Sequence, residues 1–393
     1  MTQTVALTGN TAVALAMQQI EPDVVAAYPI TPSTEIMQSF ATYIANGEVD
    51  SELVLAESEH SALSACVGAA AAGGRVMTAT SSQGLALMWE VLYIAAGMRL
   101  PIVISVANRA LSAPLNIHGD HSDMMGARDS GCIQLYAETA QEAYDNTLQA
   151  VRIAEHPEVR LPVLSGMDGF IISHSIERMV VEDREAVRGF VGPYVPHHPL
   201  LDLAHPVSYG PLALPDTYME HRRQLVEAMR RAERVIEAVG TEFGARFGRT
   251  YGLTEAYRLE DAEFGLIALS SAAGTCRVAA DELRARGMRV GVLRPRVLRP
   301  FPHARLRDAL GHLRAIAVLD RADSPGGFGA PVFTEVRSAL YGLPSPPLVI
   351  GRVFGLGGRD LLVEHVTEVA EALEKALETG EPPEPVDYLA VRE

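Results

Sequence analysis

Lysine is almost absent from this sequence of 393 residues. Of its 33 basic residues only Lys375 is a lysine, and it lies in an acidic segment close to the carboxyl terminus. Schiff-base catalysis and phosphate-binding P-loops both need a lysine in the site, so the sequence argues against both classes of protein. The excess of arginine over lysine is typical of a bias in genomic composition.

Cysteine is rare as well, the net charge is negative, and long apolar runs are lacking. Cys66, Cys132 and Cys276 form no C-x-x-C pair, which excludes a disulfide framework and a four-thiolate iron–sulfur cluster held by this chain alone. The formal net charge of −16 argues against binding to nucleic acid or to an anionic membrane. No apolar run approaches the about 18 residues of a membrane span, and residues 1–10 do not resemble a signal peptide. We therefore expect a cytoplasmic protein.

What is present is typical of a folded α/β protein with more than one domain. The chain is 48% hydrophobic and 21% charged, and it is long enough for two or three domains. In the first 170 residues, short β-branched runs alternate with helical stretches, which predicts a parallel sheet covered by helices. The predicted strands are 23–30, 75–81, 101–108 and 161–168, and the predicted helices are 33–46, 59–72, 84–97 and 140–154.

A proline-rich stretch divides this unit from a second one. Six prolines in the 23 positions of 193–215 predict an extended connector, and a charged helix is predicted over 218–239. A second α/β unit follows, with predicted strands at 264–271, 288–293, 315–320 and 347–355. We therefore expect a first domain over 1–192, a connector and helix over 193–254, and a second domain with an acidic tail over 255–393.

One segment lies where ligands bind in open α/β sheets, at the carboxyl end of the first predicted strand. In Tyr28–Glu35, Thr31 and Pro32 could cap and begin the next helix, a role that is compatible with contact to a ligand. Glu59 could complement the dipole of the helix that it opens. Alternatively, Glu59 could exchange a proton with a bound heterocycle in a partly buried cleft.

Further segments are more ambiguous. The turn Thr80–Gly84 is similar to a nucleophile elbow, but threonine replaces the first glycine and no partner pair is evident, so a turn whose backbone approaches a ligand is favoured. Arg109 could hold a carboxylate through two hydrogen bonds or form a surface salt bridge. His118–Asp123 is rich in potential ligands, but its spacing matches no common metal site, so we predict no metal on this chain. The clusters Gly326–Gly329 and Gly355–Gly358 are predicted to be loops, possible parts of an interface.

Six motifs taken together resemble the α subunit of pyruvate:ferredoxin oxidoreductases, from Gly9 to about Val366. They are YPITPSTE (28–35), SEHSA (58–62), SSQGL (81–85), NRALSAPLNI (108–117), GDHSD (119–123) and RPRVLRPFP (294–302). The resemblance implies that the first domain is the aminopyrimidine-binding domain of a thiamine-diphosphate enzyme. It also implies that the second domain is similar to the carboxyl-terminal domain of transketolase.

The resemblance also implies roles for individual residues. Glu59 matches the carboxylate that hydrogen-bonds N1′ of the aminopyrimidine, and Arg109 and Thr31 match residues that contact the 2-oxoacid. These three residues form the expected catalytic set. The expected cofactor-binding residues are Pro29, Ile30, Thr31, Glu59, Ser82, Gln83 and Gly84. The expected substrate-binding residues are Thr31, Arg109 and Asn116.

The implied enzyme needs several chains. The family holds the diphosphate and Mg²⁺ by a G-D-G…N motif on a β subunit, and this chain has no G-D-G. The [4Fe-4S] clusters would lie on γ and δ subunits or on a fused chain, and ferredoxin would dock there because this chain is acidic. The implied reaction is the oxidative decarboxylation of pyruvate to acetyl-coenzyme A and CO₂, or the reverse. The alternatives are a branched-chain 2-oxoacid enzyme, an oxalate enzyme, which the neutral Thr31 disfavours, and a non-catalytic assembly subunit.

Overall fold

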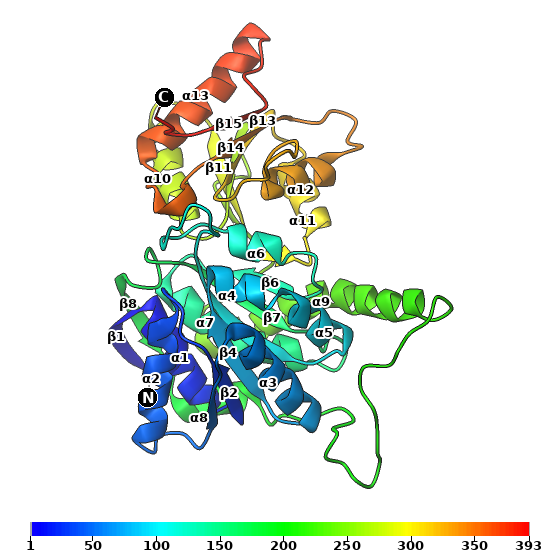
Figure 1. Ribbon diagram of the computed structural model, residues 1–393. Helices are drawn as coiled ribbons and strands as arrows, with labels where there is room; N and C mark the ends of the chain where they lie inside the picture. The colour runs from blue at the N-terminus through cyan, green and yellow to red at the C-terminus, as the bar shows by residue number, and fades with distance from the viewer. Residues whose placement is uncertain (1, 393) are drawn as a thin grey trace.

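The computed structural model describes residues 2–392 as two α/β units, one stacked on the end of the other (Figure 1). The first unit is built on a seven-stranded sheet with the order β12-β6-β7-β5-β4-β2-β3. Every pair in it is parallel except β12 with β6. Its strands are β2 (Val24–Ala27), β3 (Glu52–Leu55), β4 (Val76–Thr80), β5 (Ile102–Asn108), β6 (Ile133–Tyr136), β7 (Val163–Asp168) and β12 (Val297–Arg299).

Helices cover both faces of this sheet, and β1 (Gln3–Thr8) pairs with β8 (Ile176–Val181) in a separate antiparallel ribbon. One apolar core contains side chains of α1, α7 and α9, and another contains side chains of α3 and α5. The helices are α1 (Gly9–Ile20), α2 (Thr34–Ala45), α3 (Glu59–Ala72), α4 (Ser82–Leu87), α5 (Trp89–Gly97), α6 (Ser122–Gly126), α7 (Ala140–Glu155), α8 (Arg184–Val191) and α9 (Tyr218–Phe247).

The second unit has a six-stranded sheet with the order β15-β14-β13-β10-β11-β9. Only β9 runs antiparallel to its neighbour. Its strands are β9 (Thr254–Tyr257), β10 (Phe264–Ala268), β11 (Val290–Pro295), β13 (Ala315–Asp320), β14 (Leu348–Val353) and β15 (Val386–Tyr388). Its helices are α10 (Ala272–Ala285), α11 (His303–Leu310), α12 (Pro331–Leu340), α13 (Val363–Thr379) and the 3₁₀ turn η1 (Leu356–Gly358).

The α/β class with parallel sheets is confirmed, and several element bounds differ from the prediction. The first strand ends at Ala27 instead of residue 30, and the expected helix 84–97 is two helices separated by Met88. The helix after the connector continues to Phe247. Thr31 caps no helix, because α2 begins at Thr34 and its cap residue is Ser33. The predicted domain boundaries remain our proposal, although β12 pairs with the first sheet.

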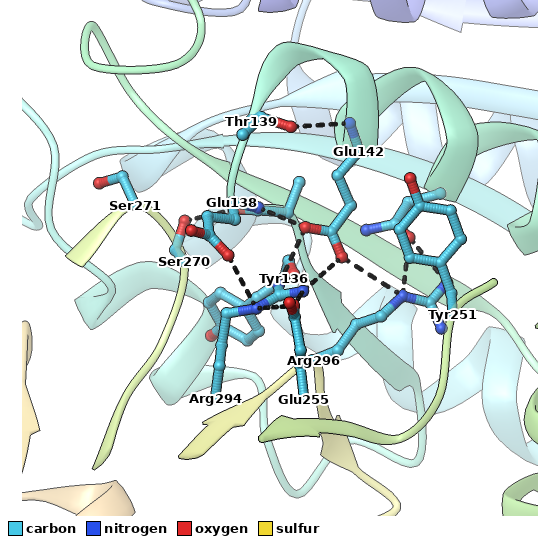
Figure 2. A network of polar contacts seen from close by, with 12 residues as sticks. Tyr136, Glu138, Thr139, Glu142, Tyr251, Glu255, Ser270, Ser271, Arg294 and Arg296 are labelled. Atoms are coloured by element: carbon cyan, nitrogen blue, oxygen red, sulfur yellow. Dashed lines mark hydrogen bonds and ion pairs between the residues drawn. The ribbon is translucent and has the colours of Figure 1, made fainter. Parts of the chain in front are cut away.

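A buried ionic network joins the two units (Figure 2). Arg294 at the end of β11 is only 3% exposed. Its guanidinium contacts Glu142 at 2.9 Å, Glu255 at 2.8 Å and Glu138 at 3.1 Å. Arg296 donates two hydrogen bonds to Asn146 Oδ1 on α7. Because buried charges need partners of opposite sign, this network disfavours separation of the two sheets.

No helix within residues 2–392 is both long and apolar enough to cross a membrane.

Candidate active site

Glu59 is the first residue of α3 and is 7% exposed. The Ser58 side chain accepts a hydrogen bond from Ser61 N–H and thereby caps the helix. The Glu59 side chain lies directly over Gly84 of α4, where a Cβ would come within 2.7 Å of Glu59 Oε1. The carboxylate forms no hydrogen bond or ion pair with any of residues 2–392. Glycine at position 84 therefore allows the Glu59 side chain to adopt this position.

The turn between β4 and α4 is held by hydrogen bonds to the segment after β5. Ser82 adopts a left-handed backbone conformation with φ of 47°. Its hydroxyl donates to Ala110 O at 2.6 Å, and Gln83 Nε2 donates to Ser112 Oγ at 2.7 Å. Because the Ser82 hydroxyl donates to a carbonyl and not to a base, the turn lacks the geometry of a serine nucleophile.

Arg109 follows β5 and is also 7% exposed. Its Nη1 donates to Thr31 O at 2.9 Å and its Nε donates to Asn116 O at 3.1 Å. No acidic side chain among residues 2–392 pairs with the guanidinium. Its Nη2 donates no hydrogen bond to any of these residues. The structure therefore brings Arg109 and Thr31 together and leaves one edge of a buried cation without an anion.

The other expected residues lie in the loop after β2 and in the segment that follows Arg109. Pro29 and Thr31 are exposed in the loop after β2, and Ile30 is partly buried. Asn116 lies seven residues beyond Arg109, and its side chain points toward the second unit, where Nδ2 donates to Gly357 O at 3.0 Å. Asn116 Oδ1 accepts from His118 N–H at 2.6 Å. Both polar atoms of the Asn116 amide are therefore already hydrogen-bonded.

Asp123 on α6 connects the two turns that carry the expected site residues. Its Oδ2 accepts from Ser82 N–H at 3.0 Å and from Arg109 N–H at 2.9 Å. Its Oδ1 accepts from Asn108 Nδ2 at 2.9 Å and from Met124 N–H at 2.7 Å. Burial raises the pKa of Asp123 to about 6, although these four donors act in the opposite direction.

The chain matches two family models along most of its length. Residues 15–241 match the model described as pyruvate flavodoxin/ferredoxin oxidoreductase, thiamine diphosphate-binding. Residues 262–366 match the pyruvate:ferredoxin oxidoreductase core domain II. The chain belongs to the pyruvate:ferredoxin oxidoreductase family. The family membership inferred from the six motifs is thereby confirmed.

Individual relatives agree with this assignment to the pyruvate:ferredoxin oxidoreductases. The pyruvate synthase subunit PorA of Thermotoga maritima is 53% identical, over 99% of this chain and 98% of that protein. The ketoisovalerate oxidoreductase subunit VorA of Pyrococcus horikoshii is 44% identical, over 95% of this chain and 94% of that protein. A solved 2-oxoglutarate:ferredoxin oxidoreductase from Magnetococcus marinus is 20% identical and has the same fold, with a TM-score of 0.72. The match covers 94% of this chain and 65% of that one.

The residues around Glu59 in this pyruvate:ferredoxin oxidoreductase chain fit the aminopyrimidine half of thiamine diphosphate. A buried carboxylate without a partner can share a proton with a ring nitrogen, and the lack of a side chain at Gly84 gives this carboxylate its place. The hydroxyls of Thr80 and Ser81 are buried nearby and make no hydrogen bond within the described chain. Among residues 2–392, no group of three His, Cys, Asp or Glu side chains is arranged to hold a metal ion.

Sequence reasoning missed the function of the loop His118–Asp123. His121 Nε2 lies 2.6 Å from Asp168 Oδ1 at the end of β7, and both side chains are buried. Asp168 also contacts Arg321 at 3.1 Å and accepts a hydrogen bond from Ser271, so it connects the two units. The density of polar residues in GDHSD was the available signal, but it indicated no role for the loop, because the partners of these residues are distant in sequence.

Proposed function

We propose that this chain is the α subunit of a thiamine-diphosphate-dependent 2-oxoacid:ferredoxin oxidoreductase. Its reaction would be the oxidative decarboxylation of pyruvate to acetyl-coenzyme A and CO₂, or the reverse, with ferredoxin as the electron carrier. The observation that carries this proposal is the buried, unpaired carboxylate of Glu59 beside Gly84. The unpaired guanidinium of Arg109 is held at the end of a neighbouring strand. The relatives named as pyruvate synthase subunits support the substrate.

Glu59 would hold the aminopyrimidine by accepting or sharing the proton at N1′. Burial favours this exchange, because water that competes for the proton is excluded. The turn Ser82–Gly84 and the loop Pro29–Thr31 would line the ring. When bound, thiamine diphosphate supplies a nucleophilic carbon that can attack the keto carbon of a 2-oxoacid. The chain's own contribution is to bind the ring, exclude water and hold the proton at Glu59.

Arg109 would bind the carboxylate of the 2-oxoacid through its unoccupied Nη2 edge. Two carbonyl acceptors already fix the guanidinium, so little side-chain freedom remains to be lost on binding. Thr31 is exposed beside Arg109, and its hydroxyl makes no hydrogen bond with the rest of the described chain. We propose that this hydroxyl hydrogen-bonds the substrate.

Other subunits would complete the enzyme. We infer that a β subunit supplies the diphosphate and Mg²⁺ ligands, and the exposed apolar side chains of Leu55, Trp89 and Leu115 near the site suit such a contact. Clusters of the [4Fe-4S] type would lie on γ and δ subunits or on a fused chain, which would also receive ferredoxin. The three cysteines here are buried and distant in sequence, and burial raises the pKa of each thiol to about 12. A cytoplasmic location fits these oxygen-sensitive partners.

The branched-chain 2-oxoacids are the second candidate substrates, because a ketoisovalerate oxidoreductase subunit is 44% identical to this chain. Initial rates of the anaerobic complex with pyruvate, 2-oxoisovalerate, 2-oxoglutarate and oxalate would decide between them. We expect the highest kcat/KM with pyruvate. A preference for 2-oxoisovalerate would assign the chain to the branched-chain enzymes.

Replacing Glu59 by glutamine tests the proposal most directly. Glu59→Gln keeps the size of the side chain but removes the proton-sharing carboxylate, so we expect kcat of the assembled complex to fall by about 10²–10⁴-fold. Glu57→Gln is the matched control, because Glu57 is exposed two residues earlier. Unchanged turnover of Glu59→Gln would support the assembly-subunit alternative instead.

A further inference from the structure

The 3₁₀ turn of the second unit contacts the loop that follows Arg109. We call residues Gly355–Gly358 the glycine turn and residues 111–121 the substrate loop. Asn116 Nδ2 donates to Gly357 O at 3.0 Å, and Gly357 N–H donates to Asp120 Oδ2 at 3.2 Å. His121 N–H also donates to Arg321 O of the second unit at 2.8 Å. The substrate loop is therefore tied to the second unit at three points.

Glycine is required where the two segments meet. A Cβ on Gly357 would lie 2.4 Å from Asn116 Nδ2, and a Cβ on Gly358 would lie 2.4 Å from His118 Cβ. Both glycines also have positive φ angles, 62° and 84°. The other side of the loop packs closely against the first unit, because a Cβ on Gly119 would lie 2.7 Å from Gly169 O. The loop is thus held closely between the two units.

The position of the loop also determines the orientation of the Arg109 side chain. The backbone carbonyl of Asn116 accepts the hydrogen bond from Arg109 Nε, while the Asn116 side chain is fixed by the glycine turn and by His118 N–H. A shift of the loop would therefore move the acceptor that orients the guanidinium. Misplacing a substrate-holding group by about 1 Å can reduce catalytic efficiency about 10²-fold.

We propose that the glycine turn is a positioning element for 2-oxoacid binding, through which the second domain sets the orientation of Arg109. Asn116 is then a positioning residue and not a direct substrate contact. The inference rests on the proposed function, because it assumes that Arg109 binds the 2-oxoacid carboxylate. It assigns the second domain a part in substrate recognition.

Gly358→Ala and Gly380→Ala form a matched pair for testing this inference. Both positions have positive φ, 84° and 74°, so both variants carry similar backbone strain. Nothing lies within 4 Å of a Cβ on Gly380, whereas a Cβ on Gly358 meets the substrate loop. In the assembled complex, we expect Gly358→Ala to lower kcat/KM for the 2-oxoacid by about 10²-fold, mainly through KM. Gly380→Ala should stay within about twofold of the wild type.

The apparent affinity for thiamine diphosphate separates positioning from general damage. It should change much less than the 2-oxoacid KM in Gly358→Ala, because the glycine turn meets the substrate loop at residues 116–120, whereas the Ser82–Gly84 turn contacts that loop at Ser112. An equal loss of cofactor and 2-oxoacid affinity would overturn the inference, as would equal KM values in the two alanine variants.

Two further variants keep the inference testable if Gly358→Ala does not assemble. Asn116→Ala removes the side-chain tether but retains the carbonyl that accepts from Arg109, and it should also raise the KM for the 2-oxoacid. Adding His118→Gly to Gly358→Ala removes the colliding Cβ and should restore most of the lost affinity. Normal KM in Asn116→Ala, or no recovery in an assembled double variant, would count against the inference. Unchanged turnover in Glu59→Gln would instead contradict the proposed function.

Discussion

Replacing Asp123 by asparagine should disturb the cofactor side and the substrate side of the site together. All four groups that contact the two carboxylate oxygens are hydrogen-bond donors: three backbone N–H groups and the Asn108 amide. An asparagine has the same shape, but its Nδ2 must face two of these donors in either orientation. The perturbation is therefore one of polarity and not of packing.

The size of the effect follows from the donors that are left without acceptors. Asp123 is 3% exposed, so water cannot replace the lost acceptor. Each buried donor without an acceptor costs about 1–3 kcal/mol, which gives about 2–6 kcal/mol for two. We expect the free energy of unfolding of Asp123→Asn to fall by this amount, and both the KM for the 2-oxoacid and the apparent affinity for thiamine diphosphate to worsen. Denaturant unfolding and steady-state kinetics of the anaerobic complex measure these quantities.

Two comparisons make this prediction specific. Asn108→Asp combined with Asp123→Asn restores an acceptor for the new amide, so the double variant should be more stable than Asp123→Asn alone. Asp320→Asn is the control, because Asp320 is equally buried but accepts from Val332 and Phe333 N–H at the start of α12. It should lose stability without a change in substrate KM. The reasoning would be refuted if Asp123→Asn kept wild-type stability and kinetics.

Two further predictions concern the contacts between the domains. Arg294→Gln should lower the free energy of unfolding by an amount near the lower end of the about 3–5 kcal/mol that a broken buried ion pair costs, because buried Glu142 keeps only the longer contact to Arg296 at 3.6 Å; an unchanged denaturation midpoint would contradict this. Burial alone would raise the pKa of Asp168, but Arg321 and His121 lower it well below its ordinary value. Its contribution to stability is therefore complete above the unfolded-state pKa of about 4 and is lost as the pH falls through the folded-state pKa. The difference in free energy of unfolding between the wild type and Asp168→Asn should be largest at neutral pH. A difference that becomes larger in acid would contradict this prediction.

Local signals in the sequence were enough to predict the elements that carry the site. The helix over 59–72 was predicted with the bounds that the structure has, because Ser58 provides a cap and Gly73, at φ of 109°, ends the helix. The strand that precedes Arg109 was also placed correctly. Both features depend on residues close together in the chain.

The features that were missed depend on partners far along the chain. The pairing of β12 with β6 joins residues about 160 positions apart, and no local pattern indicates it. The motif GDHSD was given no role, whereas in the structure Asp123 accepts hydrogen bonds from two turns and His121 contacts Asp168. By contrast, Gly355–Gly358 was predicted to be a loop and possible part of an interface, and its glycines do provide space for a loop from the other domain.

Two buried ionisable side chains without ion-pair partners argue that the site binds ligands. Arg109 and Glu59 are both buried, and neither forms an ion pair within residues 2–392. Buried charges without partners are costly, so this arrangement disfavours the empty folded state. A carboxylate at Arg109 and a protonatable ring at Glu59 would each remove one of these costs. A ligand that binds only the folded state raises its stability in proportion to RT ln(1 + [L]/Kd), so the two ligands proposed for the cleft should stabilise the complex more strongly together than either does alone.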